Sequence, residues 1–154
     1  VAALGEGFRL VVVGEGWETE KLEALVEELG VADRVDLLTF SEDARNLYPT
    51  FDVYLLPSRL EAFPVTVQEA MQAAVPVVAT EVGSVREAVD DGETGFVVPV
   101  EDVDAMADAV RRLRDDPALR DRMGERAREV GLERFDMEAG VAAWEELYRR
   151  VGAG

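Results

Sequence analysis

Short apolar runs alternate with amphipathic stretches along most of this chain. The runs are rich in valine, leucine and phenylalanine and predict buried strands at residues 8–13, 35–38, 52–56, 77–80 and 96–99. Apolar residues at helical spacing predict helices after most of these runs, and the chain beyond residue 102 reads as helical throughout. This alternation of strand and helix predicts an α/β fold with a parallel sheet of about five strands, helices on both faces and additional C-terminal helices.

Turn and capping residues set the expected ends of the first helices. Thr19 is expected to cap a helix that ends at Gly30, and Ser41 to cap a short helix over residues 43–48 that Pro49 stops. The glycine-containing turn between the first strand and the first helix makes the predicted sheet Rossmann-like.

Acidic and hydroxyl residues mark the starts of the later helices. Ser84 and Glu87 have the spacing of a capping box, in which the serine hydroxyl and the glutamate satisfy amides at the helix start. Asp102, Asp116 and Asp136 are expected to cap the three C-terminal helices. Residues 102–104 read Asp-Val-Asp, but at a helix start acids are expected, so no metal site is predicted there.

The length and composition favour one domain. The chain has 154 residues, of which 48% are hydrophobic, and this is enough for a sizeable core. No run approaches the ~18 apolar residues of a membrane span, and the first residues lack the pattern of a signal peptide. A cytoplasmic location is expected, and it agrees with the absence of cysteine.

Acidic residues dominate the charge. There are 33 acids against 16 bases and no histidine, which gives a net charge of -17. Nucleic-acid binding requires a basic face, so this class of partner is disfavoured. A strongly acidic surface suits a halophilic protein, although an arginine bias also arises from base composition alone.

Residues 57–80 combine two glutamates with a helix start. Glu61 lies in the loop after a predicted strand, and Glu69 lies in the helix that follows. At the carboxyl edge of a parallel sheet, carboxylates suit the vicinal hydroxyls of a sugar, and helix-start amides suit phosphate. The segment therefore describes either a receptor for a sugar-bearing phosphate compound or two ordinary carboxylates near a helix start.

The order of residues in this segment resembles a known family. The string runs Glu61-Ala62-Phe63-Pro64, then Glu69-Ala70-Met71, then a Pro-Val-Val strand at residues 76–78. This resembles the donor-binding segment of retaining glycosyltransferases of family 4, also called group 1, which have the GT-B fold. The later string DGETGFVVP at residues 91–99 also resembles the family's scaffold.

The resemblance implies roles for particular residues. Glu61 would be catalytic and contact the donor sugar, and Glu69 would hold the nucleotide ribose. The other residues implied at the donor are Ala62, Phe63, Pro64, Val65, Gly14 and Gly16. The substrate would be a UDP- or GDP-sugar, with no further cofactor and no metal. Apart from the resemblance, the glycine pair fits a tight turn as well as a donor contact.

A dinucleotide-binding Rossmann module is the first alternative. Gly14 and Gly16 stand where its fingerprint has two glycines, but Thr19 stands in place of the third. The acidic residue about twenty positions on would be Asp36, which begins the next strand instead of ending it. A non-enzymatic interaction domain is the second alternative.

The resemblance covers only the C-terminal half of a GT-B enzyme. The family's first βα unit, which carries cations for the donor diphosphate, and its N-terminal acceptor domain would both precede Val1. Arg59 is the candidate for a substitute phosphate contact. The last helix carries an apolar stripe, so we expect self-association through Trp144 and Tyr148. By itself the 154-residue chain is expected to be inactive, and the full-length enzyme could be peripheral at a membrane.

Overall fold

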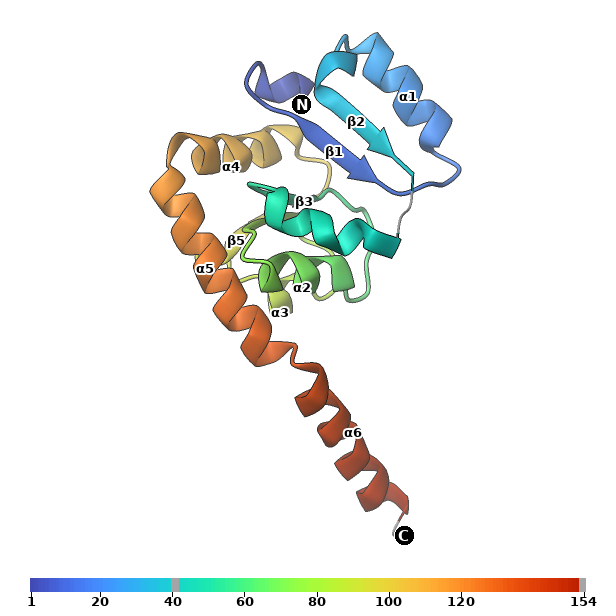
Figure 1. Ribbon diagram of the computed structural model, residues 1–154, viewed down its shortest axis with the longest axis vertical. Coiled ribbons are helices and arrows are strands. Elements are labelled where there is room, and N and C mark those ends of the chain that lie inside the picture. The colour runs from blue at the N-terminus through green and yellow to red at the C-terminus, as the bar shows by residue number, and fades with distance from the viewer. Residues whose placement is uncertain (40–41, 153–154) are drawn as a thin grey trace.

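The computed structural model describes residues 1–39 and 42–152, apart from the side chains of residues 42 and 43. A helix follows each of the first four strands, a 3-10 helix after β2 and α-helices after the others, and three longer helices follow the fifth strand (Figure 1). The elements are η1 (Ala2–Leu4), β1 (Leu10–Val13), α1 (Thr19–Glu28), η2 (Ala32–Arg34), β2 (Val35–Leu38), η3 (Glu42–Thr50), β3 (Tyr54–Leu56), α2 (Val65–Gln72), β4 (Val77–Thr80), α3 (Val85–Ala88), β5 (Gly95–Val98), α4 (Val103–Asp115), α5 (Pro117–Arg134) and α6 (Met137–Gly152).

The strand pairs are all parallel, which confirms the predicted α/β class. The hydrogen bonds divide the strands into one sheet of β1 and β2 and another in the order β3-β4-β5. The expected sheet of about five strands is therefore present as two pieces. In Figure 1, β1 lies on the side of its pair that is nearer to β3.

Helices cover both faces of the three-stranded sheet. On one face, α2 and α5 bury a cluster that includes Val77 and Ala79 of β4. On the other face, α4 buries a second cluster around Val78 and Phe96. Every residue of β4 and β5 is buried, as expected for parallel strands covered on both sides.

The two-stranded sheet is covered less completely. All four residues of β1 are only partly buried, and α1 has no buried residue. Leu22 and Leu25 of α1 and the C-cap Leu29 are exposed, although they belong to the predicted apolar face of the helix. The periodicity therefore identified the helix, but burial of its apolar face is incomplete.

The predicted cap of α1 is wrong. Glu18 is the N-cap, and Thr19 is the first helical residue, with its hydroxyl donating to the carbonyl of Gly16 at 2.8 Å. Thr19 therefore closes the preceding turn instead of capping the helix. At the other end, the C-cap is Leu29, one residue before the expected Gly30, which adopts a φ of 63° and bonds through its amide to the carbonyl of Glu27.

The segment before β3 differs from the expected short helix. It is a 3-10 helix, η3, and it contains Pro49 instead of ending before it. A proline near the last turn of such a segment removes only one amide, and the chain leaves the helix one residue later. The expected cap Ser41 lies outside the described residues.

The caps of the C-terminal helices are confirmed. The carboxylates of Asp102, Asp116 and Asp136 accept hydrogen bonds from amides three residues ahead.

The last helix, α6, extends away from the rest of the molecule (Figure 1), and Trp144 and Tyr148 on it are 61% and 70% exposed. Within the described ranges, no helix combines the length and the apolarity that crossing a membrane requires.

Candidate functional site

The loop between β3 and α2 is tied to β4 at its beginning. The hydroxyl of Thr80, at the end of β4, donates to the carbonyl of Ser58. The hydroxyl of Ser58 in turn donates to Glu61 Oε1 at 2.7 Å. This chain of hydrogen bonds orients the Glu61 carboxylate from a buried strand end.

The end of the same loop rests on the start of α3. Both the amide and the hydroxyl of Ser84 donate to the carbonyl of Ala62, at 3.0 and 2.7 Å. The predicted capping box is therefore wrong, because the serine hydroxyl is used across the loop and makes no cap hydrogen bond in α3. Gly83 approaches so closely that a Cβ atom there would lie 2.3 Å from the carbonyl oxygen of Glu61.

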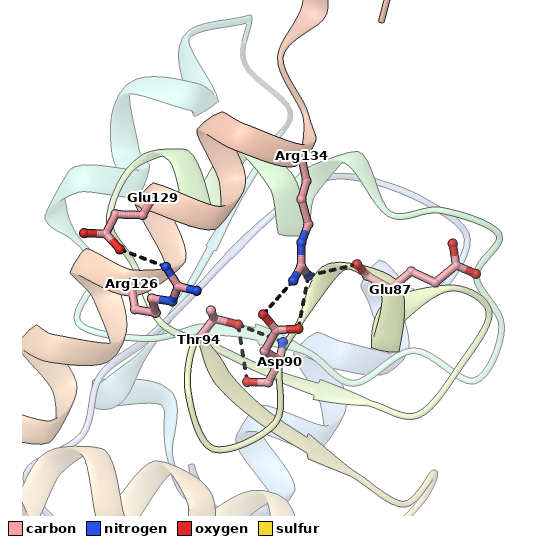
Figure 2. Close-up of polar contacts among 6 residues, drawn as sticks. All are labelled: Glu87, Asp90, Thr94, Arg126, Glu129 and Arg134. Carbon is pink, nitrogen blue, oxygen red and sulfur yellow. Dashed lines mark hydrogen bonds and ion pairs between the residues drawn. The ribbon is translucent and has the colours of Figure 1, made fainter. Parts of the chain in front are cut away.

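Phe63 links this loop to the junction of α5 and α6. Its ring meets that of Phe135 edge to face, with the centroids 5.6 Å apart. Phe135 follows the last residue of α5, where Arg134 makes a bidentate pair with Asp90 and also donates to the carbonyl of Glu87 (Figure 2). The loop therefore contacts a helix junction that is itself fastened to the core.

Glu69 is held by two side chains of η3. The phenol of Tyr48 donates to Glu69 Oε2 at 3.0 Å, and Arg45 Nε lies 2.7 Å from Glu69 Oε1. Burial, assisted by the neighbouring Tyr54, raises the pKa of Tyr48 well above its usual range, so this phenol remains a donor. Sequence reasoning missed both residues, although their spacing of three places them on one side of a helical turn.

Tyr54 is influenced by the charges of both glutamates. Burial raises the pKa of Tyr54, a hydrogen bond with Thr66 opposes the rise, and the negative charges of Glu61 and Glu69 add to it. Both carboxylates are therefore close enough to act on one phenol. The structure thus brings together the two glutamates that the sequence singled out.

The residues between the two glutamates form the start of α2. Pro64 is the N-cap with extended backbone, and Val65 is the first helical residue, with an exposed side chain. The first amides of a helix precede its first internal hydrogen bond, so those of Val65 and Thr66 point out of the helix end. A helix start beside two carboxylates suits a ligand with both phosphate and hydroxyl groups.

The other predicted donor residues have different neighbours. The amide of Gly14 donates to Leu38, and Gly16 bonds with Thr19, so these contacts lie within the two-stranded sheet and its turn. Arg59 pairs with Glu101 at 2.9 Å, and both side chains are exposed. The assignment of these three residues to a donor site stays a prediction.

The structure gives no support to a dinucleotide fingerprint. Asp36, which would have to receive a ribose, is engaged in a bidentate pair with Arg9, at 2.6 and 2.8 Å.

Among residues 1–39 and 42–152, taking only the side chains that are described, no group of three or more candidate ligands is placed to hold a metal ion.

The sequence profile of one family, described as Glycosyl transferases group 1, matches residues 1–130. The chain belongs to this family. Alpha-D-kanosaminyltransferase of Streptomyces kanamyceticus is 35% identical over 150 residues, which are 96% of this chain and 39% of that protein. The chain thus spans about two fifths of this relative.

Solved structures of other proteins share the fold. Sucrose-phosphate synthase from Thermosynechococcus elongatus is 31% identical, with a TM-score of 0.91 over 98% of this chain and 40% of that one. HepE from Anabaena, in complex with UDP-glucose, is 23% identical, with a TM-score of 0.89 over 99% of this chain and 43% of that one. At that identity, the second likeness shows the fold alone.

Proposed function

We propose that this chain is the donor-binding domain of a retaining glycosyltransferase of family 4, acting on a UDP- or GDP-sugar. Glu61 contacts the donor sugar, Glu69 binds the ribose diol, and the first amides of α2 receive phosphate. The observation that carries the proposal is that the start of α2 lies between two held carboxylates, Glu61 in the preceding loop and Glu69 within the helix. Two further points support it: the family membership, and the UDP-glucose bound to the structural neighbour HepE.

The proposed chemistry matches what these groups can do. In retaining transfer, positive charge develops at the anomeric carbon while the nucleoside diphosphate departs. The Glu61 carboxylate, held by Ser58, would stabilise the positive charge at the anomeric carbon. The helix start would stabilise the negative charge on the departing diphosphate. The acceptor must also be positioned, so the 154-residue chain by itself is proposed to have no useful transfer rate.

Nucleotide binding provides the direct test of this site. At a hundredfold excess over the dissociation constant, the matching nucleotide is expected to stabilise the chain by about 2.7 kcal/mol. We expect one member of the series UDP, GDP and ADP to raise the melting temperature, and Glu69→Gln to abolish that rise, because an amide group cannot accept the diol with two equivalent oxygens.

Glu129→Gln is the matched control for this measurement. It removes the same charge from an exposed position on α5, so the nucleotide shift should persist. A shift that survives Glu69→Gln unchanged would exclude the proposed ribose contact. The absence of a shift with every nucleotide would contradict donor binding by this chain.

We also propose that a further parallel strand lies between β1 and β3 in the longer protein. Both strands are edges of their sheets among the described residues. Leu10 and Val12 of β1 pair with Val35 and Leu37, which line the face of the sheet covered by α1. Side chains two residues apart in a strand lie on the same face, so Phe8 lies on this face as well. Phe8 packs on the cluster buried by α4, so that cluster adjoins the face covered by α1.

The position of η1 supports this strand. Gly5 follows η1 with a φ of 79°, as at the end of a helix, and η1 contacts α4. If a helix precedes η1 on the same face of the sheet as α1, a right-handed crossover through it continues in the direction from β1 to β2. The strand before that helix would then pair with the free edge of β1, on the side opposite β2. This free edge is the one that faces β3 (Figure 1).

The exposed stripe of α6 is proposed to face an acceptor-binding half in the longer protein. Without that half, the 154-residue chain is expected to pair through Trp144 and Tyr148, whose rings are 6.1 Å apart. The longer protein is proposed to be cytoplasmic and peripheral at a membrane.

Sedimentation analysis tests the domain arrangement. The 154-residue chain should sediment as a dimer and Trp144→Glu as a monomer, because a charge replaces the ring at the centre of the stripe. The protein extended upstream through the missing strand and half should be monomeric, with α6 covered. A wild-type chain that stays monomeric, or an extended protein that still pairs through Trp144, would contradict this arrangement.

A further inference from the structure

The two partners of Glu69 differ in how firmly they are fixed. Tyr48 is buried, and its ring packs against Phe51 and Tyr54 at centroid distances of 6.3 and 5.7 Å. The side chain of Arg45 is 77% exposed, whereas that of Glu69 is only 20% exposed. One oxygen of the carboxylate therefore has a rigid partner, and the other has a partner that can move away.

Arg45 occupies the position that a ribose needs. Tyr48 holds Oε2, so a diol that approaches Glu69 from solvent meets the guanidinium at Oε1. The Arg45 side chain is 77% exposed, so a ligand that offers the guanidinium a new anionic partner can displace it from Glu69. The displaced guanidinium stays attached to η3, beside the bound ribose.

The charge of the chain makes a cation at this place valuable. A nucleoside diphosphate must approach a protein with a net charge of -17 and a site with two carboxylates. Arg59 is the basic residue nearest in sequence to the two glutamates, and it is paired with Glu101. A guanidinium binds phosphate through charge-assisted and often bidentate hydrogen bonds.

We propose that Arg45 is a specificity-determining donor residue that pairs with Glu69 before the donor binds and moves to the diphosphate when ribose takes its place. This rests on the proposed function, because it requires ribose at Glu69. The exchange favours diphosphates over nucleosides. A nucleoside has to displace Arg45 without offering it a new partner, whereas a nucleoside diphosphate supplies one.

Calorimetric titration of Arg45→Met with matched ligand pairs tests this exchange. The pairs are UDP and uridine, GDP and guanosine, and ADP and adenosine, titrated at the same salt concentration. For the pair that the wild type binds, Arg45→Met should lower the affinity for the diphosphate about tenfold or more. The affinity for the nucleoside should stay the same or rise, because the competing cation is gone.

Two further variants serve as controls. Arg126→Met removes the same charge from an exposed i,i+3 pair on α5, so it should change neither affinity. Arg45→Lys retains a cation and should lose less diphosphate affinity than Arg45→Met. Melting curves of all variants establish that the fold is intact, as expected for an exposed side chain.

Other results would overturn the proposal in distinguishable ways. Diphosphate binding that is lost in Glu69→Gln but unchanged in Arg45→Met would overturn the role of Arg45 and leave the donor site standing. Equal weakening of diphosphate and nucleoside would show that Arg45 only orients Glu69. Wild-type binding of none of the six ligands would overturn the proposed function together with this inference.

Discussion

Gly124→Ala is expected to lower the free energy of unfolding by about 3 kcal/mol, at the upper end of the usual cost of overpacking. A Cβ atom at this position of α5 would lie 2.2 Å from the carbonyl oxygen of Ala74 and 3.4 Å from the ring of Pro76. Ala74 has a left-handed φ of 62° and leads into the buried strand β4, so it cannot yield. The helix must shift instead, which opens the core between α2 and α5. Denaturant unfolding of both proteins measures the loss.

Gly140→Ala is the control for this prediction. Gly140 also lies within a helix, α6, but a Cβ atom there would have nothing within 4 Å. Alanine is the better helix former by about 1 kcal/mol, so this variant should be at least as stable as the wild type. Equal stability of Gly124→Ala and wild type would mean that α5 does not pack on the Ala74 turn as described.

Gly83→Ala is expected to disturb the site more than the fold. A Cβ atom would lie 2.3 and 2.7 Å from the carbonyl oxygens of Glu61 and Ala62, and the φ of 50° adds about 1–2 kcal/mol of backbone strain. Since the loop is more easily moved than the core, it should shift, carrying the Glu61 carboxylate away from its hydrogen bond with Ser58. Affinity for the nucleotide sugar should fall at least about tenfold, as measured by calorimetry.

Gly92→Ala separates strain from contact in this experiment. Gly92 has a φ of 84°, but nothing lies within 4 Å of its Cβ position. It should lose stability through backbone strain alone and keep its affinity for the ligand. If Gly83→Ala binds as the wild type does, the close approach of Gly83 does not control the loop.

Local sequence patterns predicted the parts of the fold that depend on neighbouring residues. Asp102, Asp116 and Asp136 cap their helices as expected, because a cap requires only a side chain and amides two or three residues ahead. The same local rule failed at Ser84, whose hydroxyl bonds to Ala62. That acceptor is 22 residues away in the chain, and no local pattern indicates it.

The division of the sheet was also beyond local reasoning. The apolar runs predicted each strand, but not which edges would pair. Pairing depends on the strands that are available as neighbours, and β1 and β3 have no hydrogen bonds to one another. The partial exposure of the apolar face of α1 is likewise a tertiary property that its periodicity does not indicate.

By itself, the sequence determined the α/β class and most strands and helices, and it singled out the pair Glu61 and Glu69 as candidates, because periodicity and an ordered motif are properties of nearby residues. Only the tertiary structure decided what surrounds that pair. Tyr48 and Arg45 reach Glu69 from η3, and Gly83 and Ser84 brace the loop of Glu61 from beyond β4. Such partners come from separate elements of the chain and meet only when the strands pack side by side, so their roles follow from geometry and not from spacing.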